Sequence, residues 1–148
     1  MNPAQAGKAF KLFSDKLIKE SRVAEVAALK TLEGDMKARI HNQGRATDGS
    51  SLGSYRSKSY KKKRESQGRQ TVKKDLQFTG DLIANYTVGV TGQNRNALGF
   101  RNDKTRLIAE GQEGKKQVNK PIFTPSKGEL DNMAAAYLKE VTKIIRRV

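Results

Sequence analysis

The amino-acid sequence predicts an α+β fold in which a small antiparallel β-sheet packs against a long N-terminal helix and a C-terminal helix, with a long basic loop. Both ends of the chain carry apolar residues at helical spacing, and the second half contains short β-like segments separated by turn residues. With 148 residues, the chain has room for one domain of ordinary size. We therefore expect residues 1–148 to form a single domain.

The N-terminal helix is expected within residues 1–40, and its pattern is clearest over residues 8–40. At about 1.5 Å per residue this stretch would span about 50 Å, which is longer than a small core needs. We therefore expect part of its apolar face to meet other subunits. The alternative is a helix that breaks near Gly34. The apolar positions of the stretch are Phe10, Phe13, Leu17, Val26, Leu29, Leu32, Met36 and Ile40.

Residues 41–74 form a basic segment that we expect to be a flexible loop or arm. It has few apolar residues, so it cannot build a core alone. Its ten basic and two acidic side chains give a net charge of +8, about half of the charge of +15 on the whole chain. Long excursions of this kind are usually binding loops or arms, or segments that order on assembly. We expect deletion of residues 44–69 to leave the domain folded.

Residues 75–125 are expected to contain a short helix and an antiparallel sheet. Thr79 is placed to cap a helix that continues through residues 82–86. Farther on, Pro121 and Pro125 flank Ile122 and Phe123, which predicts an extended segment that holds two apolar side chains against the body. Three strands are expected, over residues 87–91, 97–101 and 106–110.

The C-terminal helix is expected over residues 126–148. Ser126 and Glu129 have the spacing of a capping box, which satisfies backbone N–H groups at a helix start. Basic residues at positions 143, 146 and 147 would complement the helix dipole at the other end. The apolar residues that share one helical face are Leu130, Met133, Ala134, Tyr137, Val141, Ile144, Ile145 and Val148.

Residues that support common enzyme chemistry are scarce. The chain has no Cys and one His, which excludes a disulfide framework, a thiolate zinc site and a multi-histidine metal centre. His41 has no nucleophile elbow near it, so we expect it at the surface. Asp103, Glu113 and Lys115 imitate a nuclease metal site, but the glycines around Glu113 predict a turn instead of the strand that such a site needs. Residues 111–116 lack the spacing and hydroxyl of a P-loop. We expect no enzyme activity, no cofactor and no metal.

The positive charge restricts the class of partner to nucleic acid, an anionic membrane or an acidic protein. No apolar run has the roughly 18 residues that a membrane helix needs, and the N-terminus lacks the apolar stretch of a secretory signal, so we expect a cytosolic origin and no membrane contact. Tyr55 and Tyr60 could stack on exposed bases. The alternative is a loop that is only solvated. The expected contact residues are Arg56, Lys58, Lys61, Lys62, Lys63, Arg64, Arg69, Lys73 and Lys74.

Several short motifs, taken in order, suggest a family. After the long N-terminal helix comes the Gly-rich basic stretch GRATDGSSLGSYRSKSYKKKR, and then Thr-Gly-Asp-Leu at residues 79–82. Ile-Ala-Glu-Gly follows at residues 108–111, and Pro121, Phe123 and Pro125 precede the last helix. In this order the chain resembles the tail-completion, or neck, proteins of long-tailed bacteriophages, a group that includes the head-tail joining proteins and the virion morphogenesis family.

The resemblance implies a non-enzymatic structural protein of the virion, assembled in the host cytoplasm. Such proteins form a homo-oligomeric ring, commonly of six or twelve copies, between the portal and adaptor on one side and the tail on the other. In a ring, repeated basic loops would form a positive collar that lines the DNA channel or clamps acidic surfaces of neighbouring rings. The alternative function is that of a small cytoplasmic nucleic-acid-binding protein that uses the same loop.

Overall fold

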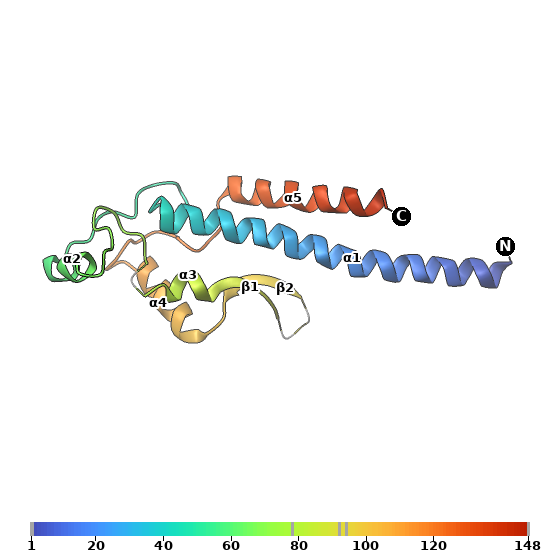
Figure 1. The fold of residues 1–148 in the computed structure, drawn as a ribbon, viewed down its shortest axis with the longest axis horizontal. Helices are drawn as coiled ribbons and strands as arrows, with labels where there is room; N and C mark the ends of the chain where they lie inside the picture. The colour runs from blue at the N-terminus through green and yellow to red at the C-terminus, as the bar shows by residue number, and fades with distance from the viewer. Residues whose placement is uncertain (1, 78, 92, 94, 148) are drawn as a thin grey trace.

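The computed structural model describes residues 2–77, 79–91, 93 and 95–147, and it confirms the α+β fold class. Helix α1 is the axis of the molecule; α5 lies along its C-terminal half on one side, and the hairpin, α3 and α4 lie on another (Figure 1). Helix α2 lies beyond the C-terminal end of α1. The elements are α1 (Pro3–Lys37), the π-helical turn η1 (Ala38–Asn42), α2 (Lys58–Glu65), α3 (Asp81–Asn85), β1 (Tyr86–Val90), β2 (Asn96–Phe100), α4 (Asp103–Glu113) and α5 (Lys127–Ile145).

Helix α1 confirms the expected long helix and begins five residues before residue 8. Asn2 caps it by accepting a hydrogen bond from the N–H of Gln5 at 2.9 Å, and Pro3 occupies the first turn, where its missing N–H costs nothing. The helix passes through Gly34 without a break, so the alternative of two helices is wrong. Because α1 continues directly into η1, the helical backbone extends to Asn42.

Two apolar clusters form the core. The first joins Leu32 and Met36 of α1 to Tyr86 of β1, with Phe100 and Phe123 packed around them. The rings of Tyr86 and Phe100 lie 4.9 Å apart, and those of Phe100 and Phe123 lie 5.1 Å apart, distances typical of favourable aromatic pairs. The expected role of the proline-flanked segment is therefore confirmed, since Phe123 packs on this cluster and Ile122 is fully buried.

The second cluster corrects our expectation for the basic segment. It consists of Ile40, Ala46, Leu52 and Ile122, so two of its four members come from residues 41–74. Backbone bonds hold them in place: Arg45 and Ser51 form an isolated antiparallel bridge. The first part of the segment is a folded part of the core, so we now expect residues 44–69 to be needed for folding.

The sheet has two strands, β1 and β2, paired antiparallel with Tyr86 opposite Phe100 and Val90 opposite Asn96. The first two predicted strands are therefore confirmed, each within one residue at either end. The short helix is also confirmed, as α3, but its cap is Gly80, whose φ of 85° favours glycine. Thr79 lies one position earlier and accepts a hydrogen bond from the N–H of Asp81 at 3.3 Å.

The third predicted strand, residues 106–110, is wrong because this stretch lies inside α4. Asn102 caps the helix by accepting a hydrogen bond from the N–H of Thr105 at 2.9 Å. Thr105 and Ala109, four residues apart, are buried on one helical face. Arg106 and Glu110 form an ion pair at 2.7 Å on the exposed side. The cap, the buried pair Thr105 and Ala109 and the ion pair Arg106–Glu110 thus favour a helix here, although the apolar Leu-Ile-Ala run suggested a strand.

Helix α5 confirms the predicted capping box. Ser126 Oγ accepts a hydrogen bond from the N–H of Glu129, and Glu129 Oε2 accepts one from the N–H of Ser126 at 2.7 Å. The predicted apolar face is only partly covered. Met133 and Tyr137 are half-buried, whereas Leu130, Ala134 and Ile145 are exposed, and residue 148 lies outside the described residues.

Candidate functional site: the basic arm

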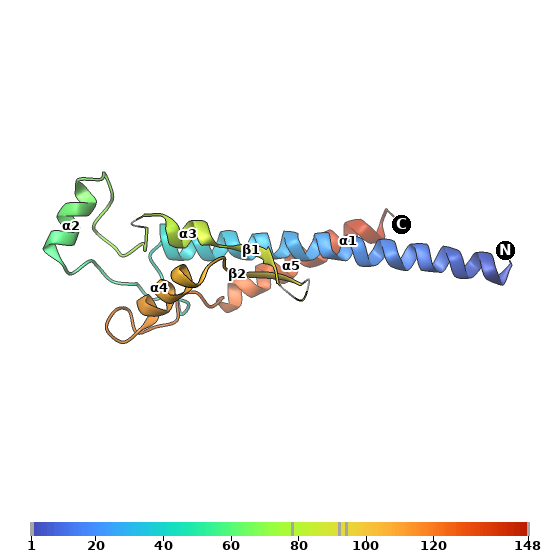
Figure 2. The ribbon, with the colours of Figure 1, turned by 90° about the horizontal axis from the view of Figure 1, so that it is seen from below.

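The basic arm, residues 53–74, is a folded projection at one end of the molecule. Its base is closed by a hydrogen bond from the N–H of Lys74 to the carbonyl oxygen of Gly53 at 2.8 Å. Ser57 caps α2 by accepting a hydrogen bond from the N–H of Tyr60. Both ribbon views place α2 at the end opposite the N-terminus (Figures 1 and 2). The expectation of a flexible arm is therefore wrong for α2, while the expected concentration of charge is retained.

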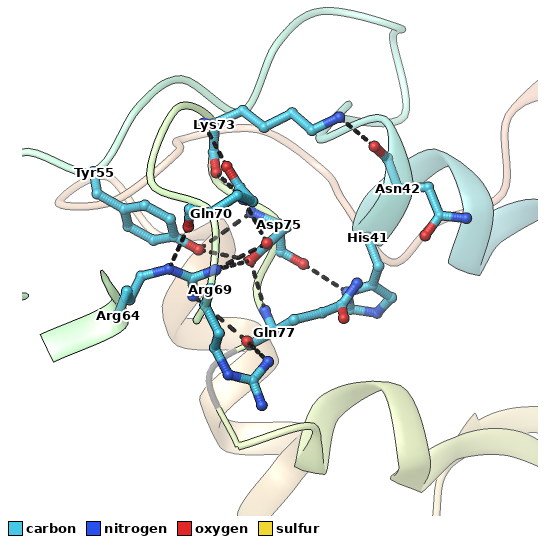
Figure 3. Close-up of polar contacts among 9 residues, drawn as sticks. All are labelled: His41, Asn42, Tyr55, Arg64, Arg69, Gln70, Lys73, Asp75 and Gln77. Carbon is cyan, nitrogen blue, oxygen red and sulfur yellow. Dashed lines mark hydrogen bonds and ion pairs between the residues drawn. The ribbon is translucent and has the colours of Figure 1, made fainter. Parts of the chain in front are cut away.

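Arg64 is the anchor of the arm. It is fully buried, with an exposed fraction of 0%, and its Nη2 donates hydrogen bonds to both carboxylate oxygens of Asp75, at 3.0 and 2.9 Å (Figure 3). Its Nε donates to the carbonyl oxygen of Gln70 at 2.9 Å. Its guanidinium carbon lies 4.5 Å from the ring centroid of Tyr55, a cation–π contact. Arg64 was expected to contact a partner, and this is corrected: its side chain faces the interior.

Asp75 receives the opposing charge. The hydroxyl of Tyr55 donates to Asp75 Oδ1 at 2.9 Å, and the N–H of Gln77 donates to the same oxygen at 3.0 Å. Burial of this carboxyl opposes ionisation, but hydrogen bonds from Gln70, Gln77 and Tyr55 and the charge of Arg64 outweigh it and lower the pKa of Asp75. Burial raises the pKa of Tyr55 to about 12, so Tyr55 keeps its donor proton at neutral pH.

His41 connects this network to the end of α1. Its exposed fraction is 3%, and its Nδ1 lies 2.7 Å from the carbonyl oxygen of Asp75. Since a carbonyl oxygen only accepts, Nδ1 carries the proton. Burial lowers the pKa of His41, so the ring is neutral at pH 7. The prediction of a surface histidine is wrong: residue 41 lies in η1, where the returning end of the arm covers it.

Two further cations of the arm are committed to backbone groups. Lys73 Nζ donates to the carbonyl oxygen of Asn42, and Arg69 Nη1 donates to that of Gln77. The approach of the arm to η1 is close at Gly44, where φ is +64° and an added Cβ would lie 2.7 Å from the carbonyl oxygen of Lys74. Only glycine fits there without displacing the backbone.

The predicted contact residues therefore divide into three groups by exposure. Arg64 is buried, and Lys61, Arg69, Lys73 and Lys74 are half-buried. The remaining four are exposed on α2 and just before it, where they can meet phosphate or carboxylate groups. These four are Arg56, Lys58, Lys62 and Lys63.

The tyrosines of the arm are less available for base stacking than the sequence suggested. Tyr55 is buried, with Arg64 over its ring. Tyr60 is half-buried, and its ring centroid lies 5.2 Å from that of Tyr55. The expected stacking platform is thus a structural pair that helps to hold α2.

An open cleft of about 910 Å³ separates the arm from α3 and α4. Its lining combines cations with apolar side chains, so it can take a ligand that carries negative charge next to an apolar group. Lys116, which follows α4, was not predicted, because 42 residues separate it from Lys74. The residues that give the cleft this character are Arg56, Lys63, Lys74, Lys116, Leu76, Leu82 and Ile108.

The residues of the nuclease alternative do not come together in the structure. Asp103 and Glu113 stand at opposite ends of α4, about 15 Å apart along the helix. Glu113 Oε1 instead accepts hydrogen bonds from the N–H groups of Ile122 and Phe123, at 2.6 and 2.9 Å. Across the described part of the chain, no three His, Asp or Glu side chains are grouped so that they could hold a metal ion.

Sequence reasoning missed the residues that hold the arm, above all Asp75 and His41. An isolated carboxylate directly after the basic run was the one available signal. Among the helices of the described residues, none combines the length and apolar character needed to cross a membrane. Comparison of the chain with protein-family models, curated proteins and solved structures found no match.

Proposed function

We propose that this chain is a structural protein of a tailed-phage virion, a neck or tail-completion protein that forms a ring joining the DNA-filled head to the tail. The observation that carries the proposal is that both ends of the molecule expose side chains suited to contact with another molecule. A folded arm presents exposed cations at one end, and the N-terminal part of α1 exposes apolar side chains at the other. Neither exposed surface stabilises an isolated monomer, whereas neighbouring subunits in a ring can cover both surfaces.

The motifs behind the resemblance agree only in part with the structure. Thr79 and Gly80 start α3, but residues 108–111, where the resemblance implies a strand, lie in the helix α4. Ile122 and Phe123 join both core clusters. The Gly-rich stretch contains Gly44, which allows the close approach of the arm to η1. The landmarks that keep a role in the fold are the long first helix, the Gly-rich stretch, the start of α3 and the proline-flanked segment, and these support the proposal.

In this proposal, the arm is the joining element. Arg64, Asp75 and His41 hold it in one orientation, so the cations of α2 are presented without a large ordering cost on assembly. Repeated around a ring, they form a collar of positive charge. The collar contacts phosphates of the genome or carboxylates of the adjoining ring.

The test reverses charge without disturbing the anchor. The variant Arg56→Glu, Lys58→Glu, Lys62→Glu changes three exposed residues of the arm, and the control Lys104→Glu, Lys139→Glu, Arg147→Glu makes the same charge change elsewhere on the surface. Each protein is added to purified heads and tails from phage particles that lack it, and infectious particles are counted. We expect the arm variant to fold but to lose joining, and the control to retain it. Normal joining by the arm variant would overturn the proposal.

The exposed cations of α2 also favour a second candidate, a nucleic-acid-binding protein. Its affinity for duplex DNA would fall by about 0.9 log units per log unit of salt for each phosphate neutralised. Four exposed cations therefore predict a slope of roughly −4. Tight binding with this slope, together with no activity in head-tail joining, would favour the second candidate over the neck protein.

A further inference from the structure

The N-terminal end of α1 projects past the C-terminal end of α5 and past the hairpin (Figures 1 and 2), whereas Leu17 and Ser21, farther along the helix, are half-buried. Phe10 is 73% exposed and Phe13 is 44% exposed. With Leu17 they form a stripe at helical spacing, and Ala24 and Ala28, which are buried in the body, continue the same stripe. Isolated helices of this length are marginal in water, so an apolar stripe of about two turns, exposed at Phe10 and Phe13, calls for a covering surface.

A matching surface lies on the body of the same chain. A groove of about 400 Å³ runs between α1, α5 and the start of β2. Ala28 and Ala134 have small side chains that leave it open, and Leu130 and Leu138 extend the apolar surface by one turn on either side of Ala134. The groove is lined by Glu25, Ala28, Leu29, Asn96, Met133, Ala134 and Tyr137.

The stripe cannot reach the groove of its own copy. Both lie on α1, which is one continuous helix, and Phe13 precedes Ala28 by 15 residues, or about 22 Å. A second copy brings a free stripe without this restriction. Since the stripe and the groove are different surfaces, their contact is head-to-tail, the kind that closes into a ring or continues as a filament.

Each copy carries a net charge of +15, but the groove itself offers a local carboxylate to a basic helix. Residues 3–23 carry five basic and two acidic side chains, a net charge of +3. Among the described residues that line the groove, the one charged residue is Glu25, whose Oε2 accepts a hydrogen bond from Asn96 at 3.0 Å. A basic helix therefore meets a carboxylate at the groove.

We propose that the N-terminal helix of one copy docks through Phe10 and Phe13 into the groove between α1 and α5 of a second copy. This inference rests on the ring of the proposed function and specifies the contact between its subunits. It requires no phage component, so it can be tested on the purified protein alone.

The absence of Cys from the chain permits a clean cross-linking test. Two single variants, Phe13→Cys and Ala134→Cys, are mixed and oxidised mildly, and the products are separated without reductant. Both positions are exposed, so the substitutions should leave the monomer folded. We expect the mixture to shift to a band at twice the chain's mass, and a mixture of Phe13→Cys with Lys104→Cys to remain at the monomer mass.

Three outcomes would overturn the inference: dimers of Phe13→Cys with itself, no cross-link between the two variants, or a wild-type protein that light scattering finds monomeric at every concentration. As a second measurement, Phe10→Ser with Phe13→Ser should reduce the assembled mass to that of the monomer. If a ring forms but the cross-link does not, the proposed contact between copies is wrong and the proposed function is unaffected. If the cross-linked assembly forms but cannot join heads to tails, the proposed function is wrong and the contact is unaffected.

Discussion

At the scale of single residues, the fold depends on two buried arginines that each tie distant parts of the backbone together. Arg39 donates to Glu129 at 2.7 Å and to the carbonyl oxygens of Ile122 and Thr124, at 3.0 and 3.1 Å. Arg64 does the same between Asp75 and the carbonyl groups of the arm. A guanidinium group has five donors in a fixed plane, which lets one side chain satisfy several backbone carbonyls that no helix or strand pairs.

Arg64 should matter more for stability than any exposed cation of the arm. Arg64→Ala leaves the Asp75 carboxylate buried without its counter-charge, and losing one partner of a buried ion pair typically costs about 3–5 kcal/mol. The matched control, Lys62→Ala, removes an exposed cation from the same helix and should stay within about 0.5 kcal/mol of the wild type. Urea denaturation measures both. Equal stability of the two variants would contradict the assignment of Arg64 as an anchor.

At the scale of elements, Glu33 joins α1 to β1. It accepts hydrogen bonds from Lys30 at 2.8 Å, Lys37 at 2.6 Å, the Thr87 hydroxyl at 3.1 Å and the N–H of Val88 at 3.2 Å. Burial opposes ionisation of this carboxyl, but the hydrogen bonds from the two lysines and from Val88 outweigh it and lower its pKa to about 2. The Glu33 carboxylate thus ties strand β1 to α1.

The low pKa of Glu33 gives a pH dependence with a defined sign. A carboxyl whose pKa falls on folding stabilises the folded state above its usual pKa of 4.5, and this contribution is lost as the pH falls toward about 2. Glu33→Gln should lower the free energy of unfolding at pH 7 and reduce its loss between pH 4.5 and 2. Denaturation at several pH values measures this. The control Glu65→Gln, at an exposed position, should keep the wild-type acid dependence, and an unchanged profile in Glu33→Gln would refute the assignment.

The helices and strands that were predicted correctly are those whose sequence signals are local. Helix α5 has a capping box and a long apolar period, and β1 and β2 are short β-like runs on either side of a turn. Helix α4 was misassigned because Leu107, Ile108 and Ala109 are compatible with either a helix or a strand over five residues. Its helical state depends on the cap at Asn102 and on burial of Thr105 and Ala109, and burial is not visible in the sequence.

The site was predicted less well than the elements, because its key contacts are not local. In the sequence, Arg64 looks like the other cations of the run Lys61–Arg64, and only its pairing with Asp75, 11 residues away, distinguishes it. His41 was expected at the surface for the same reason, since the residue that covers it lies 34 positions later. Charge density could be read from composition, but the direction in which each cation points could not.

At the scale of the whole molecule, the chain is elongated, and its core lies between the arm and the exposed start of α1 (Figure 1). The two ends are not equivalent for folding. The arm side contributes Ala46, Leu52 and the Arg64 anchor to the buried interior, whereas Phe10 and Phe13 belong to neither core cluster and are exposed in a single copy.

Two deletions should therefore have opposite effects on a single copy. Removal of residues 44–69 takes away Ala46, Leu52 and Arg64, and the product should show no cooperative thermal transition. Removal of residues 3–16 takes away helix that is exposed apart from the half-buried Ser14, and the product should melt cooperatively near the wild-type temperature while losing self-association. Circular dichroism and light scattering measure these properties. A cooperative transition in the first product, or its loss in the second, would contradict this division of the molecule.

The continuity of α1 also sets a geometric relation between the two ends. Because no kink interrupts the helix, each residue added or removed before the body changes both the reach of the apolar stripe and its bearing around the axis. Removing seven residues would shorten the reach by about 10 Å and turn the stripe by only about 20°. Removing two would shorten it by about 3 Å but turn it by about 200°, to the opposite side. Helical phase, more than length, therefore determines which direction a neighbouring copy must approach from.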